Sequence, residues 1–216
     1  MRSLRFVVAA AGMAVATAFA SPTSPKVGVE FVELAQPVPV QAVGKKVEVI
    51  EFFMYHCPAC NSLEPTISGW AKRQGDNINF RRIHMPFSGP NDPEAHLHLT
   101  LEAMGLSEQM SARVFHAMHV QRVRLNREEV IFDWIAKQGM DTKKFKQYWD
   151  SFGVKTKLRR APQLLNAYKV ESVPTVIIDG RYVTSPAIVS QAGAVTPAAF
   201  TQVLDALVAK AKATKK

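Results

Sequence analysis

The hydrophobic positions divide the chain into strands near its two ends and helices between them. Residues 47–53 (VEVIEFF) are nearly all apolar, which is typical of a central strand covered on both faces. A helix is expected from Pro58 to about Arg73, because proline suits the first turn of a helix. A second strand is expected over residues 78–85. A strand–helix–strand unit of this kind favours parallel pairing through a right-handed crossover.

Apolar residues at helical spacing follow from about residue 89 to residue 168 and indicate five successive helices. We expect Ser107 to cap the second helix, Asn126 and Glu129 to form a capping box at the third, and Asp141 to cap the fourth. The expected apolar side chains of the first four helices are Leu97, Leu101, Met104, Met110, Val114, Met118, Val130, Ile131, Trp134, Ile135, Phe145, Tyr148, Trp149 and Phe152.

The fifth helix contains Pro162, which is expected to interrupt or kink it. Strand character then returns at residues 175–178, and Asp179-Gly180 predicts a hairpin turn into a strand at Tyr182-Val183. Thr196 starts the last amphipathic helix. The predicted order is therefore β-α-β, a helical block, and β-β-α.

The first twenty residues have the pattern of an export signal. Arg2 and Arg5 form a basic start, and residues 6–20 are uncharged, rich in alanine and valine, and end in a small-x-small cleavage site. This run is shorter than the roughly 20 apolar residues of a membrane-spanning helix, so we expect cleavage rather than a permanent anchor. The proline-rich segment 21–41 should be extended, with one short edge strand near residues 29–32.

Charge and cysteine content narrow the functional classes. Cleavage removes two positive charges and no negative ones, which lowers the formal net charge from +9 to +7. The basic residues form short, scattered clusters without interleaved aromatics, so nucleic-acid binding is not expected. Two cysteines are too few for a disulfide scaffold or a four-cysteine zinc site. Export places the mature chain in an oxidising compartment such as a bacterial periplasm.

Both cysteines lie in one C-x-x-C motif, Cys57-Pro58-Ala59-Cys60, where the first strong strand meets its helix. As a structural disulfide, this short loop would stabilise the fold by only about 2 kcal/mol. As a metal site, two thiolates need further ligands, such as histidines, to complete a tetrahedral set. The strand–helix context and the export signal favour redox chemistry over both interpretations.

The position of the motif predicts different roles for its two sulfurs. Cys57 lies at or just before the helix N-terminus, where free N–H groups and the helix dipole stabilise a thiolate. Its sulfur is therefore expected to be the exposed, attacking atom. Cys60, one turn into the helix, should be more buried and should resolve or re-form the internal disulfide. Because a stable thiolate favours the reduced form, the oxidised form should be a strong thiol oxidant.

The run from Val49 to Cys60 (VIEFFMYHCPAC) resembles the active-site strand and helix of DsbA-type periplasmic thiol:disulfide oxidoreductases. Val173-Pro174-Thr175 resembles their cis-proline segment, and the similarity extends over nearly all of residues 45–216. The resemblance implies an α/β, thioredoxin-like fold with an inserted all-helical domain, which accounts for the 114 positions between Cys60 and Pro174. It also implies that Val173 and Pro174 lie opposite the cysteines and pair with bound peptide.

On this resemblance, the chain divides into a signal peptide (1–20), a discontinuous thioredoxin-like domain (21–88 and 166–216) and a helical domain (89–165). The implied function is that of a monomeric periplasmic oxidase. It would donate its internal disulfide to reduced exported proteins through a mixed disulfide, and a DsbB-type membrane partner would reoxidise it. Because the internal disulfide is the redox group, no cofactor and no metal are expected.

Several residues around the motif are candidates for tuning its chemistry. The best-known members of the family carry Pro-His between the cysteines, whereas this chain has Pro58-Ala59, and alanine offers no imidazole to the thiolate. His56 either compensates for Ala59 or occupies an aromatic shelf. Glu51 either faces solvent at a sheet edge or is a buried acid beneath the disulfide. The resemblance favours the buried acid and makes Arg82 its partner.

The other histidines are expected to be ordinary helix-surface residues rather than metal ligands, because no carboxylate or thiol cluster accompanies them: His84, His96, His98, His116 and His119. The methionines 104, 110, 118 and 140 are expected to fill the core or to line a peptide groove.

Two other functions stay open. A disulfide isomerase or reductase could use the same fold. The known periplasmic isomerases, however, are dimers with an added N-terminal domain, and residues 21–44 are too short for such a domain. A non-enzymatic metal or copper carrier could use the two cysteines and a histidine.

Overall fold

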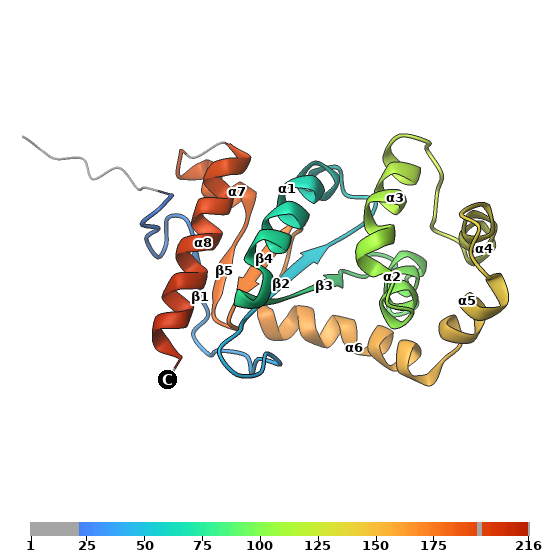
Figure 1. Ribbon diagram of the computed structural model, residues 1–216, viewed down its shortest axis with the longest axis horizontal. Helices are drawn as coiled ribbons and strands as arrows, with labels where there is room; N and C mark the ends of the chain where they lie inside the picture. The colour runs from blue at the N-terminus through green and yellow to red at the C-terminus, as the bar shows by residue number, and fades with distance from the viewer. Residues whose placement is uncertain (1–21, 194–195, 216) are drawn as a thin grey trace, which may run out of the picture.

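The computed structural model describes residues 22–193 and 196–215, so the export signal predicted at residues 1–20 lies outside the described residues. Five strands of this part form one mixed sheet in the order β1-β5-β4-β2-β3 (Figure 1). They are β1 (Val32–Glu33), β2 (Val47–Phe53), β3 (Ile78–His84), β4 (Thr175–Ile178) and β5 (Tyr182–Thr184). The edge strand predicted near residues 29–32 is β1, displaced slightly toward the C-terminus and paired antiparallel with β5.

Strand β2 is the centre of the fold, as its apolar run predicted. Every residue of β2 is buried, and the strand pairs in parallel with β3 and antiparallel with β4. Helix α1 (Pro58–Gln74) makes the crossover between β2 and β3. Asp179 and Gly180 both have positive φ, as a type I′ hairpin turn requires. At Gly180 an added Cβ would also collide with the Val38 carbonyl, so both the turn and the packing require glycine.

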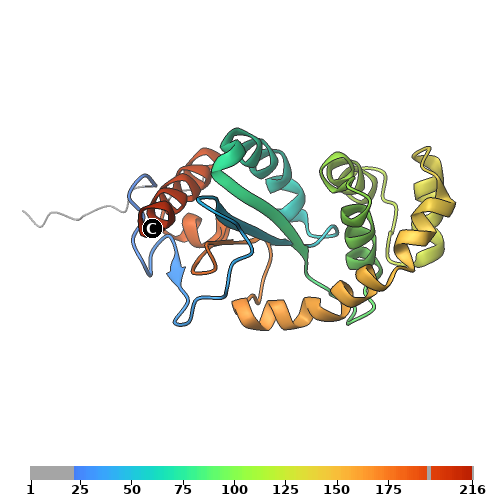
Figure 2. The ribbon, with the colours of Figure 1, turned by 60° about the horizontal axis from the view of Figure 1, so that its bottom comes forward.

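Helices cover both faces of the sheet (Figures 1 and 2). Helix α1 and α8 (Pro197–Thr214) pack on one face, where Val47 and Val49 of β2 contribute to a shared core. The C-terminal part of α6 (Phe152–Tyr168) packs on the other face, where Ile50 and Phe52 lie in a cluster with Tyr168. Alternate residues of β2 therefore enter different cores, because successive side chains of a strand point to opposite faces.

The five helices predicted between the strands are confirmed. They are α2 (Pro93–Ala103), α3 (Ser107–His119), α4 (Glu128–Lys137), α5 (Thr142–Trp149) and α6. The apolar faces of α2, α3, α4 and α5 form a third core, which also takes in Phe53, Tyr55 and Cys60 from the β2–α1 junction. This packing couples the helical block to the C-x-x-C motif. The predicted boundary at residue 165 lies inside α6, which runs from the helical block back to the sheet (Figure 2).

Two of the three predicted helix caps in this block are wrong. Asp141 does cap α5, where its carboxylate accepts the N–H groups of Lys143 and Lys144. Helix α3, however, begins its hydrogen bonding at the Leu106 carbonyl, which places Ser107 inside the first turn. Helix α4 begins at the Arg127 carbonyl, so Asn126 lies outside the helix and forms no capping box.

Three further differences from the predicted elements concern α6 and the segment before α8. Phe152 is 81% exposed and starts α6 instead of joining the apolar side of α5. Helix α6 is continuous through Pro162, because the buried Leu158, Ala161 and Tyr168 hold it in place on both sides of the proline. Before α8 lies a short helix that the hydrophobic pattern did not predict, α7 (Pro186–Gln191). No helix among the described residues has the length and apolar character to cross a membrane.

Candidate active site

Cys57 is the residue that caps helix α1. Its backbone is extended, and its Sγ accepts the backbone N–H of Cys60 at 3.3 Å. Pro58 follows at the first helical position, where its missing N–H costs no hydrogen bond. The half-exposed sulfur therefore lies at the positive end of a 17-residue helix. The structure thus places Cys57 at the helix N-terminus, which is the position that the motif predicted.

Cys60 has the opposite environment. It is 1% exposed and packs in the core that joins the β2–α1 junction to the helical block. Burial raises the pKa of the Cys60 thiol, and the negative charge of Glu51 acts in the same direction. Both cysteines are free thiols in this structure. One sulfur is thus accessible to a second molecule and the other is not, which is the predicted asymmetry.

The segment before β4 lies against the accessible sulfur. The Val173–Pro174 peptide bond is cis. The Cys57 thiol donates to the Val173 carbonyl over 3.7 Å, although 116 positions separate the two residues. The structure thus brings this segment beside Cys57, as the resemblance implied.

Glu51 is a buried acid rather than an edge residue facing solvent. It is 1% exposed and lies directly opposite Arg82 in the β2–β3 register. Its Oε2 accepts the Arg82 Nε–H at 2.7 Å. Burial raises the pKa of Glu51, although the Arg82 charge acts against that rise.

A second carboxylate, which the sequence analysis missed, completes this buried network. The Nη2 of Arg82 donates to Glu64 Oε2 at 2.9 Å and to Ser68 Oγ at 2.9 Å. Ser68 Oγ in turn donates to the other Glu64 oxygen. Glu64 lies one turn after Cys60, on the buried side of α1. A glutamate four residues after a buried cysteine was the available signal for this group.

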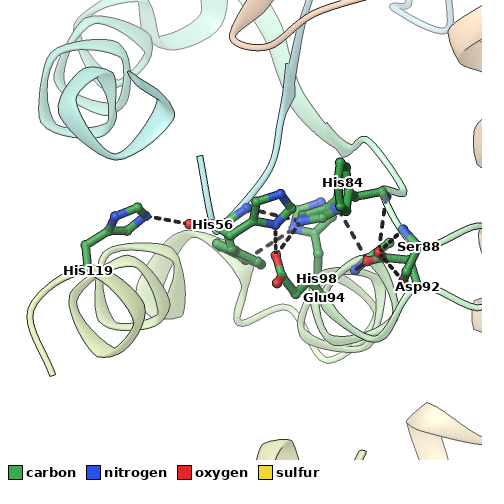
Figure 3. A network of polar contacts seen from close by, with 10 residues as sticks. His56, His84, Ser88, Asp92, Glu94, His98 and His119 are labelled. Atoms are coloured by element: carbon green, nitrogen blue, oxygen red, sulfur yellow. Dashed lines mark hydrogen bonds and ion pairs between the residues drawn. The ribbon is translucent and has the colours of Figure 1, made fainter. Parts of the chain in front are cut away.

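Three histidines, which Figure 3 labels as His84, His98 and His119, contact Tyr55, two positions before Cys57. His84 Nε2 accepts the Tyr55 backbone N–H at 3.1 Å. His119 Nε2 donates to the Tyr55 carbonyl at 2.8 Å, and His98 Nδ1 lies 3.4 Å from the Tyr55 hydroxyl. The prediction of helix-surface histidines is therefore wrong for His84 and His98, because both are buried. Burial lowers the pKa of His98 to about 3, so this ring is neutral.

His56 faces a carboxylate of α2 (Figure 3). Its Nδ1 lies 2.7 Å from Glu94 Oε2, and its ring packs edge-on against Phe87. The hydrogen bond to Glu94 raises the pKa of His56. Burial acts to raise the pKa of Glu94, but the hydrogen bond from His56, together with the nearby His84 ring, outweighs burial and lowers this pKa to about 2. The pair is therefore a close histidine–carboxylate contact next to the reactive cysteine.

The chain matches known proteins in sequence and in structure. Residues 91–205 match the family described as a DSBA-like thioredoxin domain. Over 176 residues the chain is 41% identical to the thiol:disulfide interchange protein DsbA of Burkholderia cepacia, which covers 82% of this chain and 83% of that protein. The chain belongs to the DsbA family.

Further relatives of the same family agree with this assignment. The DsbA of Bordetella parapertussis is 36% identical over 188 residues, which cover 86% of this chain and 89% of that protein. The crystal structure of Pseudomonas aeruginosa DsbA superposes with a TM-score of 0.77 at 35% identity and covers 86% of this chain and 94% of that chain. The fold is thus thioredoxin-like, and this DsbA family member is a disulfide oxidoreductase.

In this DsbA-family site, the structure brings together the residues that the sequence analysis singled out. Pro58 and Ala59 are exposed beside Cys57, and Val173, Glu51 and Arg82 surround the motif in the ways described above. Met110 is buried in the core that the helical block shares with Cys60, and the other three methionines are partly buried against the same core. Within the described part of the chain, no group of three or more histidine, cysteine, aspartate or glutamate residues is arranged to hold a metal ion.

Proposed function

We propose that this protein oxidises pairs of thiols in newly exported proteins through a mixed disulfide at Cys57. In the oxidised enzyme, a client thiolate attacks Cys57 Sγ, and the Cys60 sulfur leaves. The second client thiolate then attacks the client sulfur of the mixed disulfide and releases Cys57 as a thiolate. The client loses two electrons and two protons. The electrons reduce the Cys57–Cys60 disulfide, one proton is taken up at Cys60, and the other passes to solvent while Cys57 stays a thiolate. The contrast between a half-exposed Cys57 and a buried Cys60 carries this proposal.

The helix N-terminus supplies the driving force in this scheme. The Cys57 thiolate exists only in the reduced enzyme, so its contact with the Cys60 N–H and the dipole of α1 favours reduction of the enzyme. Oxidation of the client is favoured to the same extent.

Glu51 has the role of a buried proton carrier for Cys60. Burial raises the pKa of Glu51, which favours proton uptake by its carboxyl beneath the motif, and Arg82 keeps that carboxyl oriented. When the client attacks Cys57, the Cys60 sulfur leaves in an environment that disfavours a thiolate. A proton passed from Glu51, directly or through water, would neutralise it.

Val173 and Pro174 form the edge on which the client lies. The Val173 carbonyl is within 3.7 Å of Cys57 Sγ, which places backbone hydrogen-bonding groups beside the sulfur that the client must reach. An extended client segment can pair with this edge in the manner of an added strand. We further infer that the enzyme acts in the periplasm as a monomer and that a DsbB-type membrane protein returns it to the disulfide form.

The decisive experiment follows thiol oxidation and disulfide trapping in two variants. Cys57→Ser should lose turnover on a reduced model protein, because no accessible sulfur remains. Cys60→Ser should accumulate mixed disulfides at Cys57, because the internal disulfide can no longer form. Substantial oxidase activity in Cys57→Ser, together with a Cys60→Ser variant inert towards clients, would reverse the two roles.

Assays of the wild-type protein separate the two alternative functions, which are a disulfide isomerase and a metal carrier. Preferential rearrangement of scrambled disulfides over oxidation of thiols would indicate an isomerase. Stoichiometric metal that stays bound after chelation, without thiol turnover, would indicate a carrier.

A further inference from the structure

A cavity of about 850 Å³ opens beside the reactive cysteine. His56 and Pro58, the two chain neighbours of Cys57, line one side of it. Met118 lies on another side, and Arg122 and Arg124 follow from the segment after α3. A polypeptide attached to Cys57 therefore has this cavity next to its reacting residue.

The carboxylates of the cavity are already occupied. Asp92 is buried, and its oxygens accept the backbone N–H groups of Phe87, Ser88 and Ala95. Glu94 is buried against His56 in the contact described above. Both carboxylates are thus engaged with these partners, and neither forms an ion pair with Arg122 or Arg124.

The arginines, in contrast, offer free positive charge. Arg122 and Arg124 are exposed, and neither makes an ion pair or a side-chain hydrogen bond with another described residue. The other histidine of the cavity wall, His119, has its Nε2 engaged by the Tyr55 carbonyl. The cavity beside Cys57 thus carries two guanidinium groups that have no ion-pair partner among the described residues.

The segment with the arginines is held in a defined position relative to Cys57. The N–H groups of Val120 and Gln121 both donate to the His116 carbonyl, and the Val123 N–H donates to the Ala117 carbonyl. Leu125 anchors the segment in the core, and the preceding His119 bonds to Tyr55, two residues before Cys57.

Arg122 itself has a φ of 61°, a left-handed conformation that glycine adopts at far lower cost. A non-glycine residue in such a conformation beside an active site is a reason to look for a function of its side chain.

We propose that this cavity binds an acidic side chain of the client, close in sequence to the client cysteine that reacts with Cys57. A guanidinium group pairs with a carboxylate through two parallel hydrogen bonds, and two such groups are available. Phe87, which is 74% exposed at the rim, and Met118 supply apolar contact for the rest of the client segment. The inference rests on the proposed oxidase function and adds a preference among clients.

The test compares three peptides that each contain two cysteines. They differ only at the position next to the first cysteine, where one has glutamate, one glutamine and one lysine. Their second-order rates of oxidation by the oxidised enzyme are measured by rapid mixing, at low salt and at about 0.5 M NaCl, where exposed charges are screened. Each rate is divided by the rate of the same peptide with 2-hydroxyethyl disulfide, because a neighbouring charge alters thiol reactivity. We expect the glutamate peptide to react about threefold to tenfold faster than the glutamine peptide, with lysine slowest.

Two matched variants locate the effect. The double change Arg122→Gln/Arg124→Gln should bring the ratio of glutamate to glutamine rates close to one. The double change Lys143→Gln/Lys144→Gln removes the same charge from exposed positions on α5 and should leave the ratio unchanged. A ratio that persists without the arginines, or that falls equally in both variants, would show general attraction by the positive protein and overturn the site.

The peptide rates also test the acidic preference separately from the proposed oxidase function. Equal normalised rates for all three peptides would refute the acidic preference while leaving the oxidase intact. No oxidation of any peptide would refute the proposed oxidase function itself.

Discussion

Replacing Arg82 with methionine tests the buried charge network beneath the motif. The Arg82 side chain is 8% exposed and donates to Glu51 at 2.7 Å and to Glu64 at 2.9 Å. Methionine fills much of the same volume but leaves two buried carboxylates without a cation. Removing one partner of a buried ion pair costs about 3–5 kcal/mol, because the other charge stays buried and unpaired. We expect the free energy of unfolding to fall by that amount at pH 7.5, a large part of the roughly 5–15 kcal/mol of a typical domain.

The loss should depend on pH in a definite direction. Burial already raises the pKa of Glu51, and removing Arg82 takes away the interaction that opposes this rise. A carboxyl whose pKa is higher in the folded state than in the unfolded state favours folding at low pH, and this contribution is lost as pH rises through the folded pKa. The difference in stability between wild type and Arg82→Met should therefore shrink as the pH falls from 7.5 towards 5.

Urea unfolding of the reduced proteins, followed by tryptophan fluorescence, measures both effects. Arg73→Met, an exposed change on α1, is the matched control and should stay within about 0.5 kcal/mol of wild type. Adding Glu64→Gln to Arg82→Met should restore part of the stability, because only one buried charge then lacks a partner. A loss below about 1 kcal/mol in Arg82→Met at pH 7.5, or a loss that grows towards pH 5, would refute the argument that the two carboxylates depend on Arg82.

The remaining predictions concern the surroundings of Cys57. Ala59→His should raise the reduction potential by at least about 30 mV, equivalent to about 1.4 kcal/mol, because the imidazole can contact a thiolate that exists only in the reduced form. Equilibrium with glutathione measures this shift, and an unchanged or lower potential would show that the thiolate needs no further stabilisation. Glu94→Gln should lower the pKa of His56 in an NMR titration, whereas the exposed change Glu108→Gln should not. Because the His56 pKa is raised in the folded protein, the stability lost in Glu94→Gln should be largest at pH 5–6 and should diminish as pH rises through that pKa; an equal loss at pH 9 would contradict an ionic contact.

Much of the fold and the centre of the active site could be predicted from the sequence, because local patterns carry them. The apolar run of β2, the proline at the start of α1 and the Asp179-Gly180 turn each express a rule that acts within a few residues. The C-x-x-C motif at a strand–helix junction already places one sulfur at the start of the helix and the other about one turn further in, since three positions along a helix nearly complete a turn. The order of elements along the chain followed from the same periodicities.

The surroundings of the motif were decided by tertiary packing. Glu64 and Ser68 join Arg82 because α1 crosses the sheet beside β3. His119 reaches Tyr55 across 64 positions of chain. Such contacts depend on how whole elements pack, and residue spacing does not encode that packing.

The same reason explains which predictions failed. His84 lies on β3 and His98 on α2, and the docking of α2 against β3 placed both rings inside. Arg122 and Arg124 are unremarkable in a basic sequence, yet the end of α3 carries them to the cavity beside Cys57. The sequence alone determined that both cysteines lie at the junction of a strand and a helix, whereas the tertiary structure decided which charges surround them, because those charges come from segments far apart in the chain.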